Sequence, residues 1–153
     1  DRKRGVEDAV AGSEITILET RTDDVDRARA VANVEDALVR NPDLAACVGL
    51  WSYNGPAILQ AVTGANKLGQ VKIVAFDEEP PTLQGIIDGH IEGTIVQQPY
   101  EFGYQSVRLL KELIEGNASR IPESKQIFVP VKTITKENVD AFWADLKRML
   151  GQA

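Results

Sequence analysis

Strand-like and helix-like segments alternate along almost the whole chain, and this order constrains the fold more than any other feature. Apolar runs typical of strands lie near residues 15–18, 46–50, 71–76, 91–96 and 126–131. Segments with helical spacing of apolar residues lie around them, at residues 4–10, 31–38, 56–65, 83–87, 100–115 and 139–150. Such an order is typical of βαβ units. The sequence therefore predicts an α/β fold with a mainly parallel, doubly wound sheet and helices on both faces.

Flanking residues indicate where several of these helices begin and end. Candidate N-caps occupy residues 22–24, before the second expected helix, and Asn41-Pro42 should stop that helix. Asn54 is placed to cap the helix that Pro56 opens. Gly116 should end the helix of residues 100–115, which has the clearest apolar face.

Composition narrows the classes of partner. A chain of 153 residues has room for one domain with a real core. The net charge of -6 argues against a surface for nucleic acid or anionic lipid, because both need clustered cations, and the only basic cluster is Arg2-Lys3-Arg4. The one cysteine, Cys47, lies in an apolar run, where burial as a small hydrophobe is expected and no disulfide can form within the chain.

Polar side chains follow two of the predicted strands. Asp77 ends the run of residues 71–76, and Gln97 ends the run of residues 91–96. The carboxyl ends of parallel strands meet at one crevice, so Asp77 and Gln97 should lie near each other. A carboxylate accepts hydrogen bonds from two adjacent hydroxyls, and an amide both donates and accepts, which suits a sugar. The alternatives are a loop carboxylate or helix cap for Asp77, and a solvated strand end for Gln97.

Other candidates for ligand contact are weaker. Trp51 and Tyr53 come just after a predicted strand, where an aromatic face can stack on the C–H side of a sugar ring, and Asn54 adds a donor and an acceptor. Alternatively, Trp51 packs in the core, Tyr53 faces solvent and Asn54 only caps a helix. Arg4 could hold ring and hydroxyl oxygens with its fork of donors, although an arginine in a basic triplet is usually solvated surface.

Signs of catalysis are poor. The single histidine, His90, lies in a turn sequence without the serine, cysteine or metal-ligand spacing that a catalytic site would need. The adjacent acids Glu78 and Glu79 could be read as a glycosidase pair, but a solvated charged loop explains them better. The chain also lacks a glycine-rich phosphate loop. We therefore expect no enzyme activity, no metal site and no cofactor.

Several ordered motifs together resemble one protein family. They are Arg4-Gly5, Asn41-Pro42-Asp43-Leu44, Val74-Ala75-Phe76-Asp77, Asp88-Gly89-His90-Ile91-Glu92-Gly93-Thr94, Gln97-Gln98-Pro99 with Phe102-Gly103, and Ile134-Thr135-Lys136-Glu137-Asn138-Val139. In this order and spacing they resemble the bacterial periplasmic sugar-binding proteins of the ribose-binding type, which are the substrate-binding components of ABC importers. The Phe-Asp turn also occurs in the effector domains of LacI-type repressors.

The resemblance implies a protein of two α/β lobes that close on a sugar, of which this chain is similar to the later half. By that similarity Arg4, Asp77 and Gln97 fall on positions that hold sugar hydroxyls and the ring oxygen. Trp51 occupies a position where an asparagine is common, and Asn54 follows three residues later. Val25 replaces an aromatic residue that is often found near that point, which removes one expected stacking surface.

The resemblance also implies how the chain divides. Residues 1–97 would form the sugar-binding lobe, incomplete at its start. Residues 98–125 would form a hinge and a helix that normally packs on the other lobe, and residues 126–153 the final strand and helix. An unpartnered amphipathic helix and an uncovered sheet edge favour self-association, for example by exchange of the helix of residues 100–114 between two chains.

Two functions of different classes remain. The favoured one is the sugar-binding subunit of a bacterial ABC transporter, which would be exported to the periplasm and would act with a membrane permease. The segment of residues 135–150 favours this interpretation. The alternative is the effector-binding domain of a LacI-type transcription regulator, with the same fold and sugar chemistry. A sugar-modifying enzyme would need an acid–base pair that the sequence does not offer.

Overall fold

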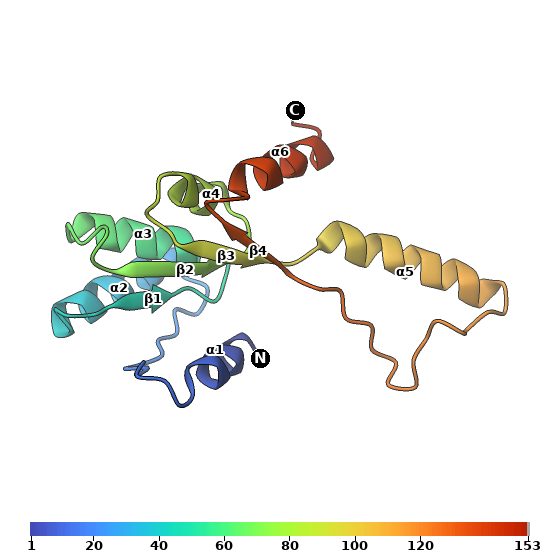
Figure 1. Ribbon diagram of the computed structural model, residues 1–153, viewed down its shortest axis with the longest axis horizontal. Coiled ribbons are helices and arrows are strands. Elements are labelled where there is room, and N and C mark those ends of the chain that lie inside the picture. The colour runs from blue at the N-terminus through green and yellow to red at the C-terminus, as the bar shows by residue number, and fades with distance from the viewer. Residues whose placement is uncertain (153) are drawn as a thin grey trace.

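The computed structural model describes residues 1–152 and is a mixed α/β structure around one sheet (Figure 1). The strands are β1 (Ala46–Val48), β2 (Lys72–Phe76), β3 (Gly93–Val96) and β4 (Lys132–Thr135). The helices are α1 (Arg2–Val10), α2 (Arg27–Arg40), α3 (Asn54–Gly64), α4 (Pro80–Ile87), α5 (Pro99–Ile114) and α6 (Val139–Met149).

The sheet has the strand order β1-β2-β3-β4. β1, β2 and β3 are parallel, with Ala46 opposite Lys72 and Val74 opposite Gly93. β4 runs antiparallel to β3, with Ile134 opposite Thr94. The predicted α/β class with a mainly parallel sheet is therefore confirmed, and the carboxyl ends of β1, β2 and β3 lie at the same edge.

The main core lies on one face of this sheet. Ile73 and Ala75 lie two residues apart in β2, so their side chains point to the same face of the sheet, and both are fully buried. Thr94 and Ile134 lie beside Ala75 in register and extend the same buried face across β3 and β4. Four helices cover it, and their contributions to the core are Leu38 of α2, Ile58 and Val62 of α3, Leu83 and Ile86 of α4, and Val139 of α6.

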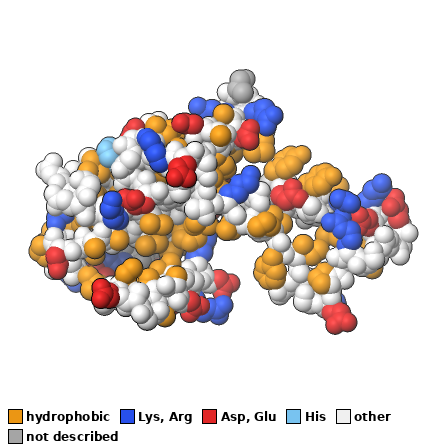
Figure 2. Space-filling model, in the orientation of Figure 1, with side chains coloured by type: hydrophobic (Ala, Val, Ile, Leu, Met, Phe, Trp, Pro, Cys, Tyr) orange, Lys and Arg blue, Asp and Glu red, His pale blue; other side chains and the backbone are white. Residues whose placement is uncertain are grey.

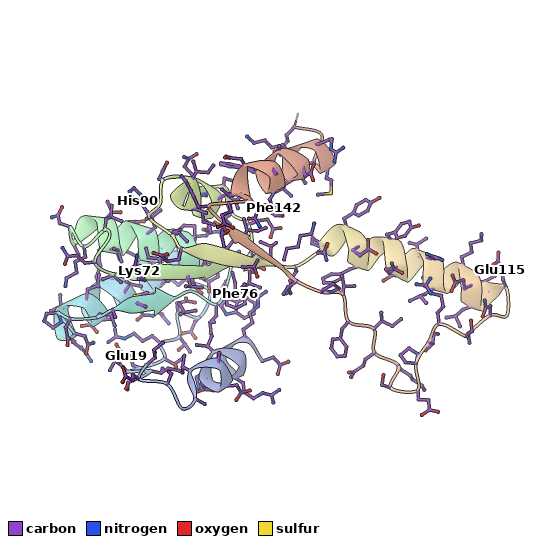
Figure 3. The ribbon with its side chains drawn as sticks, viewed as in Figure 1. Glu19, Lys72, Phe76, His90, Glu115 and Phe142 are labelled. Atoms are coloured by element: carbon purple, nitrogen blue, oxygen red, sulfur yellow. The ribbon has the colours of Figure 1, made fainter. Side chains whose placement is uncertain are left out.

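The opposite face of the sheet is covered more thinly. Phe76 points to this face and is half-buried, and the guanidinium of Arg2 in α1 lies 4.8 Å from the centroid of its ring (Figure 3). Val74 and Ile95, on the same face, are also half-buried. Every residue of α1 is exposed or half-buried, so this helix is held mainly by its polar contacts.

Two of the predicted strands are wrong. Residues 15–18 pair with no other strand of the described chain, and Ile15 and Leu18 are exposed. The segment that follows is attached to α2 by the ion pair of Arg21 with Asp36 at 2.6 Å, and it does not pair with the edge strand β1. Residues 126–131 are also irregular. The last strand, β4, begins directly after them at Lys132, where Ile134 can enter the core. Apolar alternation thus indicated strands that lack a hydrogen-bonding partner in this structure.

The predicted helix caps also need correction. The N-cap of α2 is Asp26, whose carboxylate accepts hydrogen bonds from the backbone N–H groups of Ala28 and Arg29, so residues 22–24 lie outside the helix. In α3 the N-cap position is Tyr53, and Asn54 is already the first helical residue. The side chain of Asn54 is therefore free for contacts outside the helix.

One part of the chain extends away from the sheet. α5 and the irregular residues after it form an arm, defined here as residues 98–131, that leaves at the end of β3 and returns at β4 (Figure 1). All α5 residues are exposed or half-buried, including Tyr100, Val107, Leu110 and Ile114. The space-filling view shows apolar side chains along this arm (Figure 2). The hydrophobic face predicted for α5 therefore exists but is not covered.

Candidate functional site

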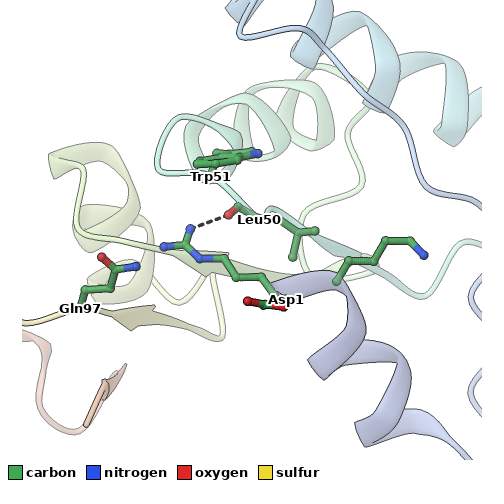
Figure 4. Close-up of a pocket in the computed structure, with 6 residues that line it drawn as sticks. Asp1, Leu50, Trp51 and Gln97 are labelled. Carbon is green, nitrogen blue, oxygen red and sulfur yellow. Dashed lines mark hydrogen bonds between the residues drawn. The ribbon is translucent and has the colours of Figure 1, made fainter. Parts of the chain in front are cut away.

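The edge of the sheet at the carboxyl ends of the parallel strands carries a hollow of about 400 Å³ (Figure 4). Leu50 and Trp51 reach it after β1, and Gln97 reaches it directly after β3. The start of the chain supplies the other wall, with Asp1, Arg2 and Lys3. Trp51 and Gln97 therefore line the same hollow, whereas Asp77, which was predicted to lie near Gln97, is not among the residues that line it. Trp51 is 63% exposed, which leaves its ring free for a ligand.

Asp77 lies beside this hollow at the end of β2. Its backbone has a φ of +67°, a left-handed conformation that is uncommon outside glycine. Two hydrogen bonds to β3 hold it there, because its N–H donates to the Ile95 carbonyl at 2.9 Å and its carbonyl accepts from the Thr94 hydroxyl at 2.7 Å. Such held conformations cluster at functional sites, and here the carboxylate reaches Arg2, which lines the hollow.

The carboxylate of Asp77 is paired with Arg2. Nη1 and Nη2 of Arg2 donate to the two carboxylate oxygens at 3.0 and 3.1 Å, and Nη1 also donates to the Leu50 carbonyl at 2.6 Å, the dashed line in Figure 4. The guanidinium lies 5.7 Å from the centroid of the Trp51 ring and 4.8 Å from that of Phe76. Two-point pairing with aromatic contacts fixes the orientation of a guanidinium.

Arg4, the arginine that the sequence indicated, is not brought to this hollow. It is exposed and lies outside the residues that line the cavity. Residues two apart on a helix lie on nearly opposite sides, so with Arg2 turned toward Asp77 the side chain of Arg4 starts from the other side of α1. No pattern in the sequence indicated this choice, because α1 lacks an apolar stripe that would show which side faces the sheet.

Asn54 and Tyr53 hold the loop that carries Trp51. The Asn54 amide oxygen accepts from the Trp51 N–H at 2.9 Å, and its Nδ2 donates to Asp23 at 2.9 Å. The Tyr53 ring is buried, and its hydroxyl donates to the other oxygen of Asp23 at 2.5 Å. The structure therefore places both side chains behind the exposed ring of Trp51, in a network that ends on Asp23.

Hydrogen bonding sets the charge state of this network. Partial burial raises the pKa of Asp23, but hydrogen bonds from Tyr53, Asn54 and the Val25 N–H outweigh it, so the pKa lies below its usual value. The pKa of Tyr53 is raised, first by its hydrogen bond to Asp23 and then by burial. Asp23 is thus an ionised acceptor at neutral pH. Val25, next to it, is 80% exposed with a φ of +65°.

Acidic residues form a second, smaller hollow of about 240 Å³ on the other side of Asp77, lined by Ser52, Asp77, Glu78, Glu79 and Pro80. Glu79 is tied to the surrounding structure, because Arg27 donates to both of its oxygens and Ser52 donates at 3.1 Å. These hydrogen bonds keep the pKa of Glu79 low, whereas burial raises the pKa of Glu78. Both carboxylate oxygens of Glu79 therefore already accept hydrogen bonds from within the chain.

The remaining chemistry-bearing side chains lie apart from this edge. His90 is exposed in the turn between α4 and β3 (Figure 3). Burial raises the pKa of the Cys47 thiol to about 11, so the thiol is protonated at neutral pH. Within residues 1–152, no three His, Cys, Asp or Glu side chains are grouped to hold a metal ion. In the same range, no helix is both long and apolar enough to cross a bilayer.

Comparison with known proteins shows the family. A family model described as periplasmic binding protein domain matches residues 1–118. The Ribose import binding protein RbsB of Salmonella typhimurium is 27% identical over 116 residues, which are 76% of this chain and 39% of that protein.

Two solved structures are similar over most of the chain. A glucose-galactose binding protein, GanP, from Geobacillus stearothermophilus has a TM-score of 0.80 at 28% identity, over 89% of this chain and 48% of that one. An ABC transporter solute binding protein from Agrobacterium vitis with bound D-fucose has a TM-score of 0.81 at 27% identity, over 94% and 49%. The chain spans less than half the length of these three relatives. The resemblance expected from the sequence is confirmed, and the chain belongs to the periplasmic binding protein domain family.

Proposed function

We propose that this chain binds a monosaccharide at the crevice edge and contributes one wall of the solute-binding subunit of a bacterial ABC importer, without catalysis. The observation that carries the proposal is the convergence of a carboxylate, an amide and an exposed indole, from Asp77, Gln97 and Trp51, at the ends of three neighbouring strands. Hydroxyl groups need acceptors and donors in pairs, and the C–H face of a sugar ring packs on an indole.

The relatives support the ligand class. Their printed names and titles refer to ribose, to glucose and galactose, and to D-fucose, all of them uncharged monosaccharides. We therefore propose a ribose-like pentose or a hexose for this chain. All three relatives are binding proteins, which favours a transporter component over the effector domain of a LacI-type regulator.

Within this proposal the predicted contacts have different roles. Asp77 and Gln97 would bind hydroxyls and Trp51 would stack on the ring. Asn54 and Tyr53 would position Trp51, since both are committed to Asp23. Val25 lies exposed beside Asp23 and would form an apolar rim in place of a stacking aromatic. For Arg4, a ligand contact would require α1 to turn.

We also propose the cellular setting and the division of the chain. The importer role implies a periplasmic location and a membrane permease as partner of the full protein. Residues 1–97 would form the sugar-binding lobe, residues 98–125 the hinge and a helix that belongs with a second lobe, and residues 126–153 the returning strand and helix. The return of β4 beside β3 and the packing of α6 on the core support that division.

A direct test is calorimetric titration of the chain with a panel of pentoses, hexoses and inositols, after circular dichroism has shown a folded protein. We expect saturable binding of at least one sugar and its loss in Asp77→Ala. Ser119→Ala, in the exposed arm, is the control that should bind as the wild type does. A folded chain that binds no member of the panel would contradict the proposal for this chain.

A further inference from the structure

We infer that Asp23 and Glu79 are positioning residues, which hold the indole of Trp51 in place for the ligand without contacting the ligand themselves. They act through the Trp51 loop, defined here as residues 51–53, and through the first residue of α3. Neither acid is among the residues that line the hollow of about 400 Å³. The inference rests on the proposed binding of a sugar at this edge of the sheet. It adds a role for two acids for which the sequence indicated only a helix cap and a solvated loop.

The ring of Trp51 is not fixed by burial. It lines the hollow and is 63% exposed, so packing against its neighbours restrains it only in part (Figure 4). A mobile side chain that is ordered on binding lowers the affinity, because its lost freedom opposes association. The rest of the restraint on the indole must therefore come from the backbone of the Trp51 loop.

On one side the Trp51 loop is held by Asp23. Tyr53 and Asn54 donate to the two oxygens of this carboxylate at 2.5 and 2.9 Å. The amide oxygen of Asn54 accepts from the backbone N–H of Trp51 at 2.9 Å. One amide therefore connects the carboxylate to the residue that carries the indole, and a rotation of the Asn54 side chain would release Trp51.

On the other side the Trp51 loop is held by Glu79, the residue before α4. The hydroxyl of Ser52 donates to Glu79 at 3.1 Å, and Arg27 of α2 donates to both of its oxygens at 2.9 and 3.2 Å. The guanidinium of Arg27 also lies 5.5 Å from the centroid of the Tyr53 ring, which connects the two sides. The loop is thus attached to α2 and to the start of α4 as well as to α3.

Both carboxylates are ionised at neutral pH. Hydrogen bonds from Arg27 lower the pKa of Glu79, and for Asp23 the effect of burial is outweighed by hydrogen bonds from Tyr53 and Asn54, so its pKa is also lowered. Hydrogen bonds to an ionised acceptor are about twice as strong as those between neutral groups. A neutral side chain of the same shape should therefore hold the Trp51 loop more weakly.

Fluorescence measures whether the ring is held, without any ligand. The chain has two tryptophans, so Trp51 is the only one in Trp143→Phe. In that background we expect Asp23→Asn and Glu79→Ala to lower the fluorescence anisotropy of Trp51, because a loosely held ring turns during the lifetime of its excited state. Asparagine has one acceptor oxygen in place of two, so it cannot accept hydrogen bonds on both sides of the group as Asp23 does.

Asp24→Asn is the matched control for Asp23→Asn. Asp24 is exposed and pairs with Arg29, and asparagine tolerates its φ of +52°. The anisotropy of Trp51 should therefore stay at the wild-type value in this variant. Circular dichroism checks that every variant folds. Ser52→Ala and Tyr53→Phe each remove a single donor, and they keep the inference testable if a carboxylate variant does not fold.

Calorimetry with the tightest-binding sugar of the panel measures the consequence for affinity. We expect Asp23→Asn to weaken binding about fivefold, and Asp24→Asn to change it by less than about twofold. In the background of Trp51→Ala, Asp23→Asn should have almost no further effect, because the ring that it positions is absent. A general loosening of the fold would instead weaken binding by the same factor in both backgrounds.

The outcomes separate the inference from the proposed function. Wild-type anisotropy of Trp51 in both Asp23→Asn and Glu79→Ala would overturn the inference. An equal loss of affinity with and without the indole would overturn it too. In either case a wild type that binds a sugar leaves the proposed function standing. A folded wild type that binds no sugar would contradict the proposed function, and the role of the two acids in binding with it.

Discussion

Two glycines of α3 show how one residue type serves different purposes within a single helix. A Cβ on Gly55 would lie 2.7 Å from the Thr82 hydroxyl oxygen and 3.0 Å from the Ala75 Cβ. Gly55 therefore allows α3 to approach both α4 and β2 closely. A Cβ on Gly64, the last residue of the helix, would meet no heavy atom of the described chain within 4 Å.

Alanine at these two positions should have opposite effects on stability. We expect Gly55→Ala to lower the free energy of unfolding by about 1–3 kcal/mol, because the added methyl group overpacks a closed contact. Gly64→Ala should raise it by about 0.4–1 kcal/mol, since alanine restricts the unfolded chain and is a better helix former. Urea unfolding of both variants measures the difference. Equal effects at the two sites would contradict the packing described for Gly55.

At the same scale, the sequence predicted some site residues and missed others for physical reasons. Asp77 and Gln97 could be found because each follows an apolar strand, and parallel strands must end at one edge. Arg2 could not be found, since the side of α1 that faces the crevice depends on contacts with Leu50 and Asp77, which are distant in sequence. Asn54 looked like a helix cap, but its partner Asp23 lies 31 residues away.

Among the elements, helices were predicted more successfully than strands. The helical segments all form, with shifted ends, because an amphipathic helix satisfies its own backbone hydrogen bonds. A strand needs a neighbour, and local alternation does not show whether one is present. Residues 15–18 and 126–131 have strand-like patterns yet stay unpaired, whereas Lys132–Thr135 pairs with β3 because Ile134 fits the core.

The hydrogen bonds that Tyr53 and Asn54, at the start of α3, donate to Asp23 should make the free energy of unfolding depend on pH. The pKa of Asp23 is lower in the folded chain than its ordinary value of 3.8. Its carboxylate therefore stabilises the fold above about pH 4, and this contribution is lost as the pH falls through the lowered pKa. We expect Asp23→Asn to be less stable than the wild type at pH 6, and to lose less stability between pH 5 and pH 3.

Thermal unfolding of both proteins across that pH range is the measurement. Asp36 and Glu79 also have lowered pKa values, but they contribute equally in the two proteins, so the difference isolates Asp23. Tyr53→Phe, which removes one donor to Asp23, is a useful control and should give an intermediate pH dependence. Parallel curves for wild type and Asp23→Asn would contradict the role assigned to this carboxylate.

For the whole molecule, the arm of residues 98–131 contrasts with the rest of the chain. α6 is also amphipathic, and it packs Val139, Phe142 and Trp143 on the core next to the sheet. α5 has an equally apolar face that is open to solvent, as Figure 2 shows along the arm. An exposed apolar surface of this kind marks an interaction site or favours aggregation. We propose that in this chain it leads to self-association, for example by exchange of α5 between two copies.

A concentration series in light scattering tests this proposal. We expect the average mass of the wild type to rise above that of one chain as the concentration increases, because burying Leu110 and its neighbours stabilises the associated form. Leu110→Glu places a charge on the apolar face and should restore the mass of a single chain. Arg108→Glu places the same side chain on the opposite, charged side of α5, near Glu101 and Glu112, and should leave association almost unchanged. A hundredfold range of concentration corresponds to about 3 kcal/mol in association free energy. A wild type that stays monomeric over that range would rule out self-association at working concentrations.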